Sequence, residues 1–285
     1  MVNYRDLQKT FPAYKEGDLL VIAGSCAVES REDISNKAQR LAELRDQGYP
    51  IHGLRGGAFK PRTNPKSFQG LGEDGLRYLV EARERTGLPI VTEVMDPRQV
   101  DLFNRYGIDV WQIGSRNMQN YDLLREIGSN RDGKPVLMKR GMCAAPEEIL
   151  GAIQYLGDGP VLFCLRGLQW PIHHPSLIEK SRELPHQRQH EGKDSRFWVD
   201  VDHIEHIRDY LKERQNNVIV GYDPSHPAGY WELVPQITRD AVDHGAEFLE
   251  IEIIGDEAER AHRECDGRQA LTIDQLKGLM DNVFH

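Results

Sequence analysis

The sequence contains no run of about 18 apolar residues, the minimum for a membrane-spanning helix, so no membrane partner is expected. Residues 1–15 are polar and lack the apolar core of a secretory signal peptide, which predicts a cytoplasmic protein. Cysteine is scarce: the four residues Cys26, Cys143, Cys164 and Cys265 are far apart and form no CxxC pair. A disulfide framework is therefore not expected in a chain of this kind.

An excess of basic residues is also absent. The chain has 36 Lys and Arg against 45 Asp and Glu, which gives a net charge of −9. This balance disfavours nucleic acid as a partner, because binding to a polyanion needs a basic surface. It still allows a small anionic substrate, which a local cluster of Arg and Lys can hold inside an acidic protein.

Short apolar segments recur along the chain, each rich in Val, Ile or Leu, as is typical of strands buried on both faces. They are Leu19–Ala23, Ile51–Arg55, Pro89–Val94, Val110–Gly114, Val136–Lys139, Val161–Leu165, Val218–Tyr222 and Phe248–Ile253. Amphipathic stretches separate most of them, for example Ile34–Gln47, Gly75–Thr86, Pro97–Tyr106, Pro146–Leu156 and Leu233–His244. Eight strand–helix repeats predict an α/β fold, a single (β/α)8 TIM barrel.

Two regions depart from this repeat. Residues 1–18 precede the first strand, and we expect an N-terminal extension that covers the barrel bottom or reaches a neighbouring subunit. Residues 19–285 form the predicted barrel, interrupted by a long insertion at about 169–198 after the sixth strand. A connection of this length in a compact domain is usually functional or disordered, and we interpret it as a candidate lid.

Basic residues gather where the predicted strands end, the position of the active site in TIM barrels. We call this set the anion clamp: Arg55, Lys60, Arg62, Arg116, Lys139 and Arg166. Buried cations need partners, so their shared position predicts a site for phosphate and carboxylate groups. The alternative for any one of them is a solvated surface charge.

Four possible metal ligands follow the first, seventh and eighth strands: Cys26, His226, Glu252 and Asp266. One sulfur, one ring nitrogen and two carboxylates suit a divalent ion such as Mn, Fe, Co or Zn. No short metal-binding motif is present, so the spacing alone also allows a structural role for His226.

Two more carboxylates, Glu93 and Asp223, also end predicted strands. Placed near cations they could handle water and protons as catalytic groups. They could equally neutralise the lysines and arginines of the anion clamp.

Together these residues resemble the 3-deoxy-D-arabino-heptulosonate 7-phosphate (DAHP) synthases, in the branch related to the 3-deoxy-D-manno-octulosonate 8-phosphate (KDO8P) synthases. The matching segments are AGSCAVES, LRGGAFKPRTNPKSFQGLGEDGL, VTEVMD, QIGSRNMQN, LMKRGM, LRG, YDPSHPAG, LEIEI and CDGRQAL. They cover nearly the whole chain in the family's order.

The resemblance implies a TIM barrel enzyme of aromatic amino acid biosynthesis, the shikimate pathway. It would condense phosphoenolpyruvate (PEP) with erythrose 4-phosphate to a 3-deoxy-2-keto sugar acid phosphate and inorganic phosphate. It implies a metal on Cys26, His226, Glu252 and Asp266, and a homo-oligomer, a tetramer or dimer. PEP would be held by Arg55, Lys60, Arg116, Lys139 and Arg166 with Gly114 and Ser115, and the acceptor would lie along Lys60, Arg62 and Thr63. Lys60 would protonate the aldehyde oxygen, and Glu93 would orient the water.

The sequence departs from the family pattern near the expected far end of the acceptor. After Arg166 it reads GLQW, where relatives carry an Arg-Thr pair, and Ser195–Asp200 replaces the family's TRNTLD. These changes leave open a related enzyme of a specialised pathway with another aldose acceptor. A catalytically inactive barrel with a binding or regulatory role is a further alternative.

Overall fold

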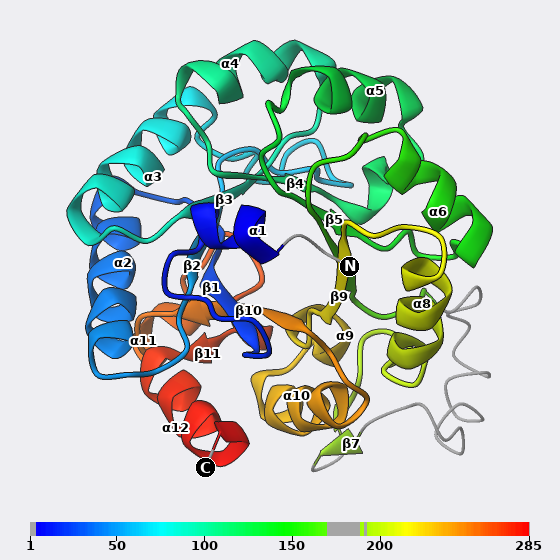
Figure 1. Cartoon of the computed structure of the whole chain (residues 1–285). Helices are drawn as coiled ribbons and strands as arrows, with labels where there is room; N and C mark the ends of the chain where they lie inside the picture. The colour runs from blue at the N-terminus through cyan, green and yellow to red at the C-terminus, as the bar shows by residue number, and fades with distance from the viewer. Residues whose placement is uncertain (1–3, 170–188, 191–192, 285) are drawn as a thin grey trace.

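The computed structural model describes residues 4–169, 189–190 and 193–284, and it confirms the predicted single (β/α)8 barrel. Eight parallel strands form a closed sheet in the order β1-β2-β3-β4-β5-β6-β9-β10, and β10 pairs back to β1 (Figure 1). They are β1 Leu20–Ala27, β2 Gly53–Gly57, β3 Ile90–Glu93, β4 Val110–Ile113, β5 Val136–Lys139, β6 Val161–Leu165, β9 Val218–Tyr222 and β10 Phe248–Ile254. Most of the predicted insertion 169–198, namely 170–188 and 191–192, lies outside the described residues.

Helices surround the strands as an outer ring (Figure 1). The main ones are α2 Arg31–Asp46, α3 Glu73–Thr86, α4 Val100–Arg105, α5 Tyr121–Asn130, α6 Pro146–Gln154, α8 His203–Lys212, α10 Val234–Asp243 and α12 Ile273–Phe284. Local signals fix their ends: the Ser30 side chain accepts a hydrogen bond from the backbone N–H of Asp33 at the start of α2. Gly87 ends α3 with φ +70°, a left-handed conformation that favours glycine. No helix in the described part of the chain is long and apolar enough to cross a bilayer.

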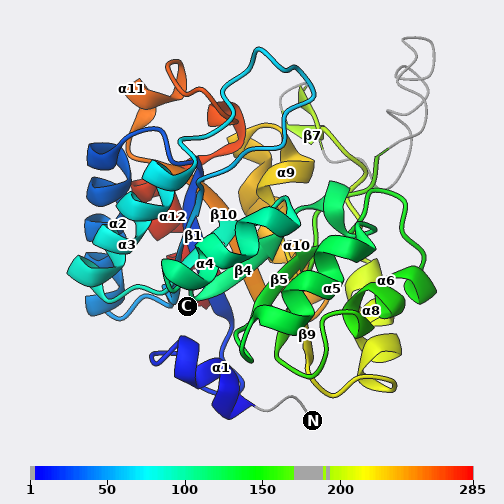
Figure 2. The ribbon, with the colours of Figure 1, turned by 90° about the horizontal axis from the view of Figure 1, so that it is seen from above.

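The chain also forms several shorter helices and strands outside the barrel sheet and its main helices. They are α1 Tyr4–Thr10, η1 Pro97–Gln99, η2 Ser115–Asn117, β7 Gln189–His190, β8 Lys193–Asp194, α9 Ser225–Ala228, η3 Trp231–Leu233, α11 Glu257–Arg260, η4 Gly267–Gln269 and β11 Leu271–Thr272. Helix α1 lies at one end, and β7 and α11 lie at the other (Figure 2). The end that carries β7 and α11 is where the strands finish.

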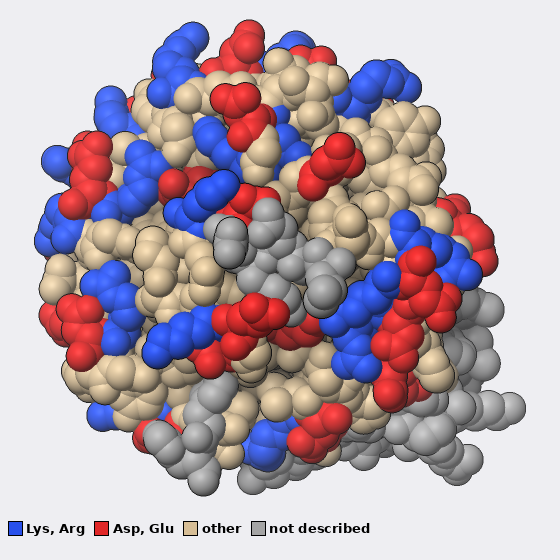
Figure 3. Space-filling model, in the orientation of Figure 1, with Lys and Arg blue, Asp and Glu red and all other residues tan. Residues whose placement is uncertain are grey.

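Helix α1 and the residues after it cover the floor of the barrel. Leu7, Phe11 and Tyr14 are buried. They pack in one cluster with residues at the beginnings of the strands, including Leu20 and Phe248. On this face the described Lys and Arg side chains are interspersed with Asp and Glu rather than gathered by sign (Figure 3).

The strand register carries polar side chains from the apolar barrel interior to the opposite end. Alternate residues of a strand face the same side. On β5, buried Leu137 of the interior cluster is thus followed two residues later by Lys139. On β10, Phe248 of the same cluster is followed by Glu250 and Glu252. The barrel is consequently apolar at its floor and ionic at its mouth.

Candidate active site

A cavity of about 400 Å³ opens at the carboxyl ends of the strands, and all six residues of the anion clamp line it. Arg55 lies in the middle of β2, which continues to Gly57, whereas Lys139 ends β5 and Arg166 directly follows β6. Thr63, Gly114 and Ser115 line the same cavity, as do Glu93, His226 and Asp266. Sequence segments far apart in the chain thus meet around one pocket, as the strand-end pattern predicted.

The clamp cations differ in burial and in the partners they have. Arg55, Lys60, Lys139 and Arg166 are buried, whereas Arg62 is half-buried and Arg116 is exposed. The Lys60 ammonium donates a hydrogen bond to the Cys26 carbonyl oxygen at 2.9 Å and lies 3.3 Å from its sulfur. Burial alone would lower the pKa of Lys60, but the neighbouring Cys26 and Cys265 sulfurs raise it. Lys60 is therefore a charged donor at neutral pH.

Arg166 is the buried clamp cation whose charge the described residues compensate least. Its side chain is only 4% exposed, and its Nε has no hydrogen-bond partner among the described residues. Its Nη1 lies 3.5 Å from the sulfur of Met142, and its guanidinium stacks 4.5 Å from the centre of the Phe197 ring. Burial lowers the pKa of Arg166, because nearby charges do not offset the loss of water. An anion that binds beside such a cation would stabilise it.

Two cations of the clamp are held from below by carboxylates. Arg55 pairs with Glu252 at 2.8 Å and with Glu250 at 3.1 Å. Lys139 pairs with Glu250 at 2.9 Å and with Asp223 at 2.5 Å. The predictions from sequence did not include Glu250, although its two-residue spacing from Glu252 on β10 puts both on the same face.

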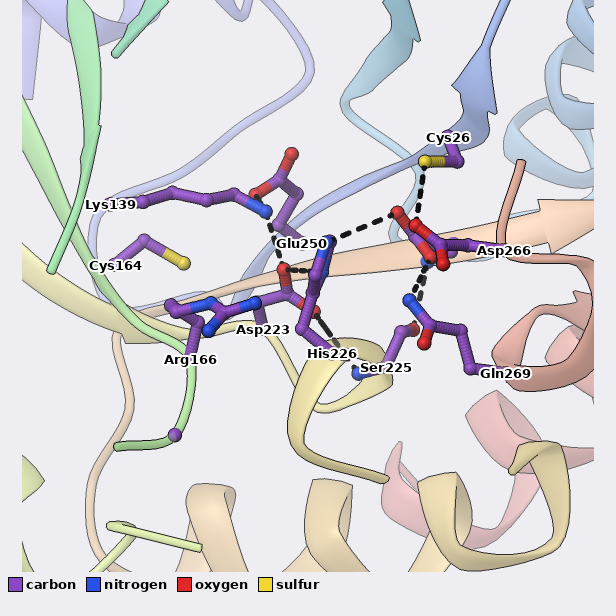
Figure 4. Close-up of polar contacts among 12 residues, drawn as sticks. Cys26, Lys139, Cys164, Arg166, Asp223, Ser225, His226, Glu250, Asp266 and Gln269 are labelled. Atoms are coloured by element: carbon purple, nitrogen blue, oxygen red, sulfur yellow. Dashed lines mark hydrogen bonds and ion pairs between the residues drawn. The ribbon is translucent and has the colours of Figure 1, made fainter. Parts of the chain in front are cut away.

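Three of the four predicted metal ligands converge tightly. Donor atoms of His226, Glu252 and Asp266 all lie within 4.8 Å of one another. Asp266 also lies 3.2 Å from the sulfur of Cys26, so it joins Cys26 to the other two predicted ligands; Figure 4 shows Cys26, His226 and Asp266 on one side of the site. Asp266 stands just before η4 with φ +50°, and this unusual backbone conformation turns its carboxylate toward the other ligands.

The ligand set has the supporting contacts that metal sites need. The carboxylate of Asp223 contacts Nδ1 of His226 at 2.6 Å, and His226 Nε2 lies 3.8 Å from Glu252. Gln269 donates a hydrogen bond to the second oxygen of Glu252 at 2.6 Å. Burial by itself raises the pKa of Asp223, but His226 and Lys139 lower it well below the ordinary value. A sulfur, a ring nitrogen and two oriented carboxylates fit a divalent transition ion.

Cys265 was not predicted as part of the site. Its sulfur lies 2.8 Å from that of Cys26, and Arg62 donates to it at 3.1 Å. Its position directly before Asp266 was the only signal available in the sequence.

The two carboxylates with predicted catalytic roles lie at different depths. Glu93 lines the cavity, and burial raises its pKa despite the opposing charges of Lys60, Lys139 and Arg55. A side chain at position 114 would collide with Glu93, since a Cβ there would lie 2.0 Å from its Oε1. Asp223 is fully buried beneath Lys139 and His226. Its contacts are those of a group that holds other site residues.

Arg196 and Phe197 also line the cavity and were not among the predicted site residues. They belong to the segment that follows the insertion. Phe197 lies between two guanidinium groups, 4.5 Å from that of Arg166 and 5.0 Å from that of Arg196. Arg196 approaches Asp266 at 3.5 Å. Only the departure of this segment from the family pattern pointed to it.

Comparisons with known proteins agree with this arrangement. The profile of a family described as the DAHP synthetase I family matches residues 11–283. A phospho-2-dehydro-3-deoxyheptonate aldolase of Thermotoga maritima is 37% identical over 94% of this chain and 69% of its own length. A 2-dehydro-3-deoxyphosphooctonate aldolase of Bordetella petrii is 28% identical over 94% of this chain and 90% of its own length.

Solved structures give the same result. The crystal structure of a Thermotoga maritima DAHP synthase matches with a TM-score of 0.76 and 33% identity, over 94% of this chain and 69% of that one. A truncated form of the synthase from the same organism matches with a TM-score of 0.71 and 29% identity, over 95% and 90% of the two chains.

Proposed function

Since this chain belongs to the DAHP synthetase I family and is an enzyme of the DAHP synthase type, we propose that its substrates are PEP and erythrose 4-phosphate. The observation that carries the proposal is the buried guanidinium of Arg166, which has no carboxylate in contact among the described residues, at a cavity shared with Lys139 and Lys60. Such a cation is stabilised by a phosphate or carboxylate that enters the cavity. An inactive barrel is disfavoured, because all six clamp cations line the cavity and donor atoms of His226, Glu252 and Asp266 lie within 4.8 Å of one another.

In the proposed reaction, Arg116, Lys139 and Arg166 bind PEP, with backbone contacts from Gly114 and Ser115. C3 of PEP attacks the aldehyde carbon, and Lys60 delivers a proton to the aldehyde oxygen. Water adds at C2 of PEP, oriented by Glu93, whose raised pKa suits it to accept a proton. The C–O bond to phosphate then breaks and inorganic phosphate leaves.

The proposed metal site consists of Cys26, His226, Glu252 and Asp266. A divalent ion there would supply Lewis-acid polarisation of an oxygen in the cavity. The task of Asp223 in this scheme is to hold His226 and Lys139 in place, as its contacts at 2.6 Å and 2.5 Å indicate.

The acceptor is proposed to lie along Lys60, Arg62 and Thr63. One observation favours a second candidate, a different aldose used in a specialised pathway. Phe197 lines the cavity between Arg166 and Arg196, in the segment that departs from the family pattern. An aromatic ring there offers apolar contact to the acceptor. The cytoplasmic location and the homo-oligomer stay predictions.

The test measures phosphate release from PEP with Mn²⁺ and each member of a panel of aldoses, with mass spectrometry of the products. Erythrose 4-phosphate should trigger release and give the seven-carbon product. Phosphate release that is independent of any aldehyde would contradict the condensation. A different aldose that supports much faster turnover would select the second candidate.

A further inference from the structure

A fully buried carboxylate, Glu250, lies directly below the anion clamp. Its two oxygens face two different clamp cations, with Oε1 at 3.1 Å from Arg55 Nε and Oε2 at 2.9 Å from Lys139 Nζ. Figure 4 shows Glu250 beside the end of Lys139. Its side chain is 0% exposed, so an anion in the cavity would contact the two cations and not Glu250. Any influence on the anion is therefore indirect.

Glu250 also completes a ring of alternating contacts beneath the cavity. Arg55 continues the ring to Glu252 at 2.8 Å, and Lys139 continues it to Asp223 at 2.5 Å. His226 closes it between them, 2.6 Å from Asp223 and 3.8 Å from Glu252. The ring thus joins the anion clamp to the proposed metal ligands.

Within this ring, Arg55 and Lys139 each have another carboxylate partner besides Glu250, but no other group replaces the negative charge of Glu250. Arg55 keeps Glu252 and Lys139 keeps Asp223 if the Glu250 carboxylate is removed. Neither cation would be left buried and unpaired, the situation that makes loss of a charge partner severely destabilising. Local charge at the clamp would instead become more positive by one.

We propose that Glu250 is a positioning residue that holds Arg55 and Lys139 together and restrains the strength with which the clamp binds anions. The inference rests on the proposed function, because it takes the clamp as the phosphate and PEP site. A clamp of six cations that binds its substrate must also release inorganic phosphate. The buried carboxylate of Glu250 neutralises part of the clamp's positive charge, which lowers the affinity for phosphate without occupying the place where phosphate binds.

The experiment measures binding of inorganic phosphate and of PEP by calorimetry to the wild-type protein and to Glu250→Gln. Glutamine keeps the shape and removes the charge. We expect about tenfold tighter phosphate binding, in line with the coupling between close charge pairs, and a lower kcat together with a lower KM for PEP. A purely structural role would weaken binding or leave it unchanged.

The matched control is Glu247→Gln, which removes a carboxylate just before the same strand at the barrel floor, where Glu247 pairs with Lys212. It should leave both affinities unchanged. Glu250→Asp keeps the charge but retracts it, and should tighten phosphate binding by less than Glu250→Gln. This variant carries the test if the glutamine variant does not fold.

The outcomes separate the two proposals. If the wild-type protein binds neither PEP nor phosphate, the proposed function fails. If it binds them and the Glu250 variants bind no more tightly, the role of Glu250 is overturned. Failure of both variants to fold would assign Glu250 to stability alone and would also overturn it.

Discussion

At the scale of single residues, the cations of the cavity differ in what they need from a ligand. Arg55 has two carboxylate partners, whereas the described residues give Arg166 only Met142 and the ring of Phe197. A buried guanidinium without a carboxylate costs stability in the free protein, because its lost hydration is not replaced. That cost is recovered when an anion binds. Arg166 is therefore where stability and substrate affinity should oppose each other most clearly.

Replacement of Arg166 by Met should accordingly separate the two properties. The value of kcat/KM for PEP should fall at least about 100-fold, the scale of a charge-assisted interaction of about 3 kcal/mol. The melting temperature without ligand should stay the same or rise. Arg131→Met is the matched control: Arg131 is equally buried but donates to the carbonyls of Pro160 and Gly159 at 3.0 and 2.8 Å. Its loss should lower stability by about 2 kcal/mol or more. An equally large loss of stability in Arg166→Met would contradict this reading.

The ligand set predicts a sulfur–metal bond through Cys26. Cobalt(II) added to the wild-type protein should give a near-ultraviolet sulfur-to-metal absorption band, and Cys26→Ser should abolish it, since hydroxyl oxygen does not replace thiolate as a ligand. Cys143→Ser is the control, because Cys143 is exposed and is not in the ligand set. An unchanged band in Cys26→Ser would show that Cys26 does not supply the sulfur, and the neighbouring Cys265 would then be its source.

At the scale of elements, the floor and the mouth of the barrel perform separate tasks. Phe11 follows α1 and is fully buried among residues at the beginnings of the strands. We expect Phe11→Ala to lower the free energy of unfolding by about 3–5 kcal/mol, because it leaves a large cavity in the floor. The KM for PEP should change less than twofold. Steady-state kinetics and urea unfolding of the same variant measure the two effects. A selective rise in KM in a folded variant would show that the floor and the mouth are coupled.

The sequence predicted the strands and helices more completely than the side chains that meet only in the folded barrel. All eight strands were predicted, with boundaries mostly within two residues, because buried strands leave apolar runs. The predicted start of the first strand was one residue from that of β1, but β1 continues to Ala27, beyond the predicted end at Ala23. The polar Ser25 interrupts the apolar pattern there. Glu250 and Cys265 were not predicted, because their roles depend on which side chains the closed barrel brings opposite them. Residues 195–200 gave no periodic signal that would place Arg196 and Phe197 at the cavity.

At the scale of the whole molecule, a buried histidine at the floor should make stability depend on pH. His52 is 5% exposed, and its Nδ1 accepts a hydrogen bond from the backbone N–H of Val21 at 3.0 Å. Burial lowers the pKa of His52 to about 4, so the folded protein keeps this ring neutral where the unfolded chain protonates it. The unfolded state then binds more protons between about pH 6.5 and pH 4, and stability must fall as pH falls through this range.

The contribution of His52 to this fall approaches about 3 kcal/mol near pH 4. It is measured as the difference between urea unfolding at pH 7.5 and pH 4.5 in wild-type protein and in His52→Gln, whose amide can still accept from Val21. The glutamine variant should lose less stability on acidification, because it has no proton to take up. His206→Gln, at an exposed position on α8, should follow the wild-type curve. Parallel curves for wild-type and His52→Gln would mean that His52 is protonated in the folded barrel, in which case its hydrogen bond from Val21 could not persist.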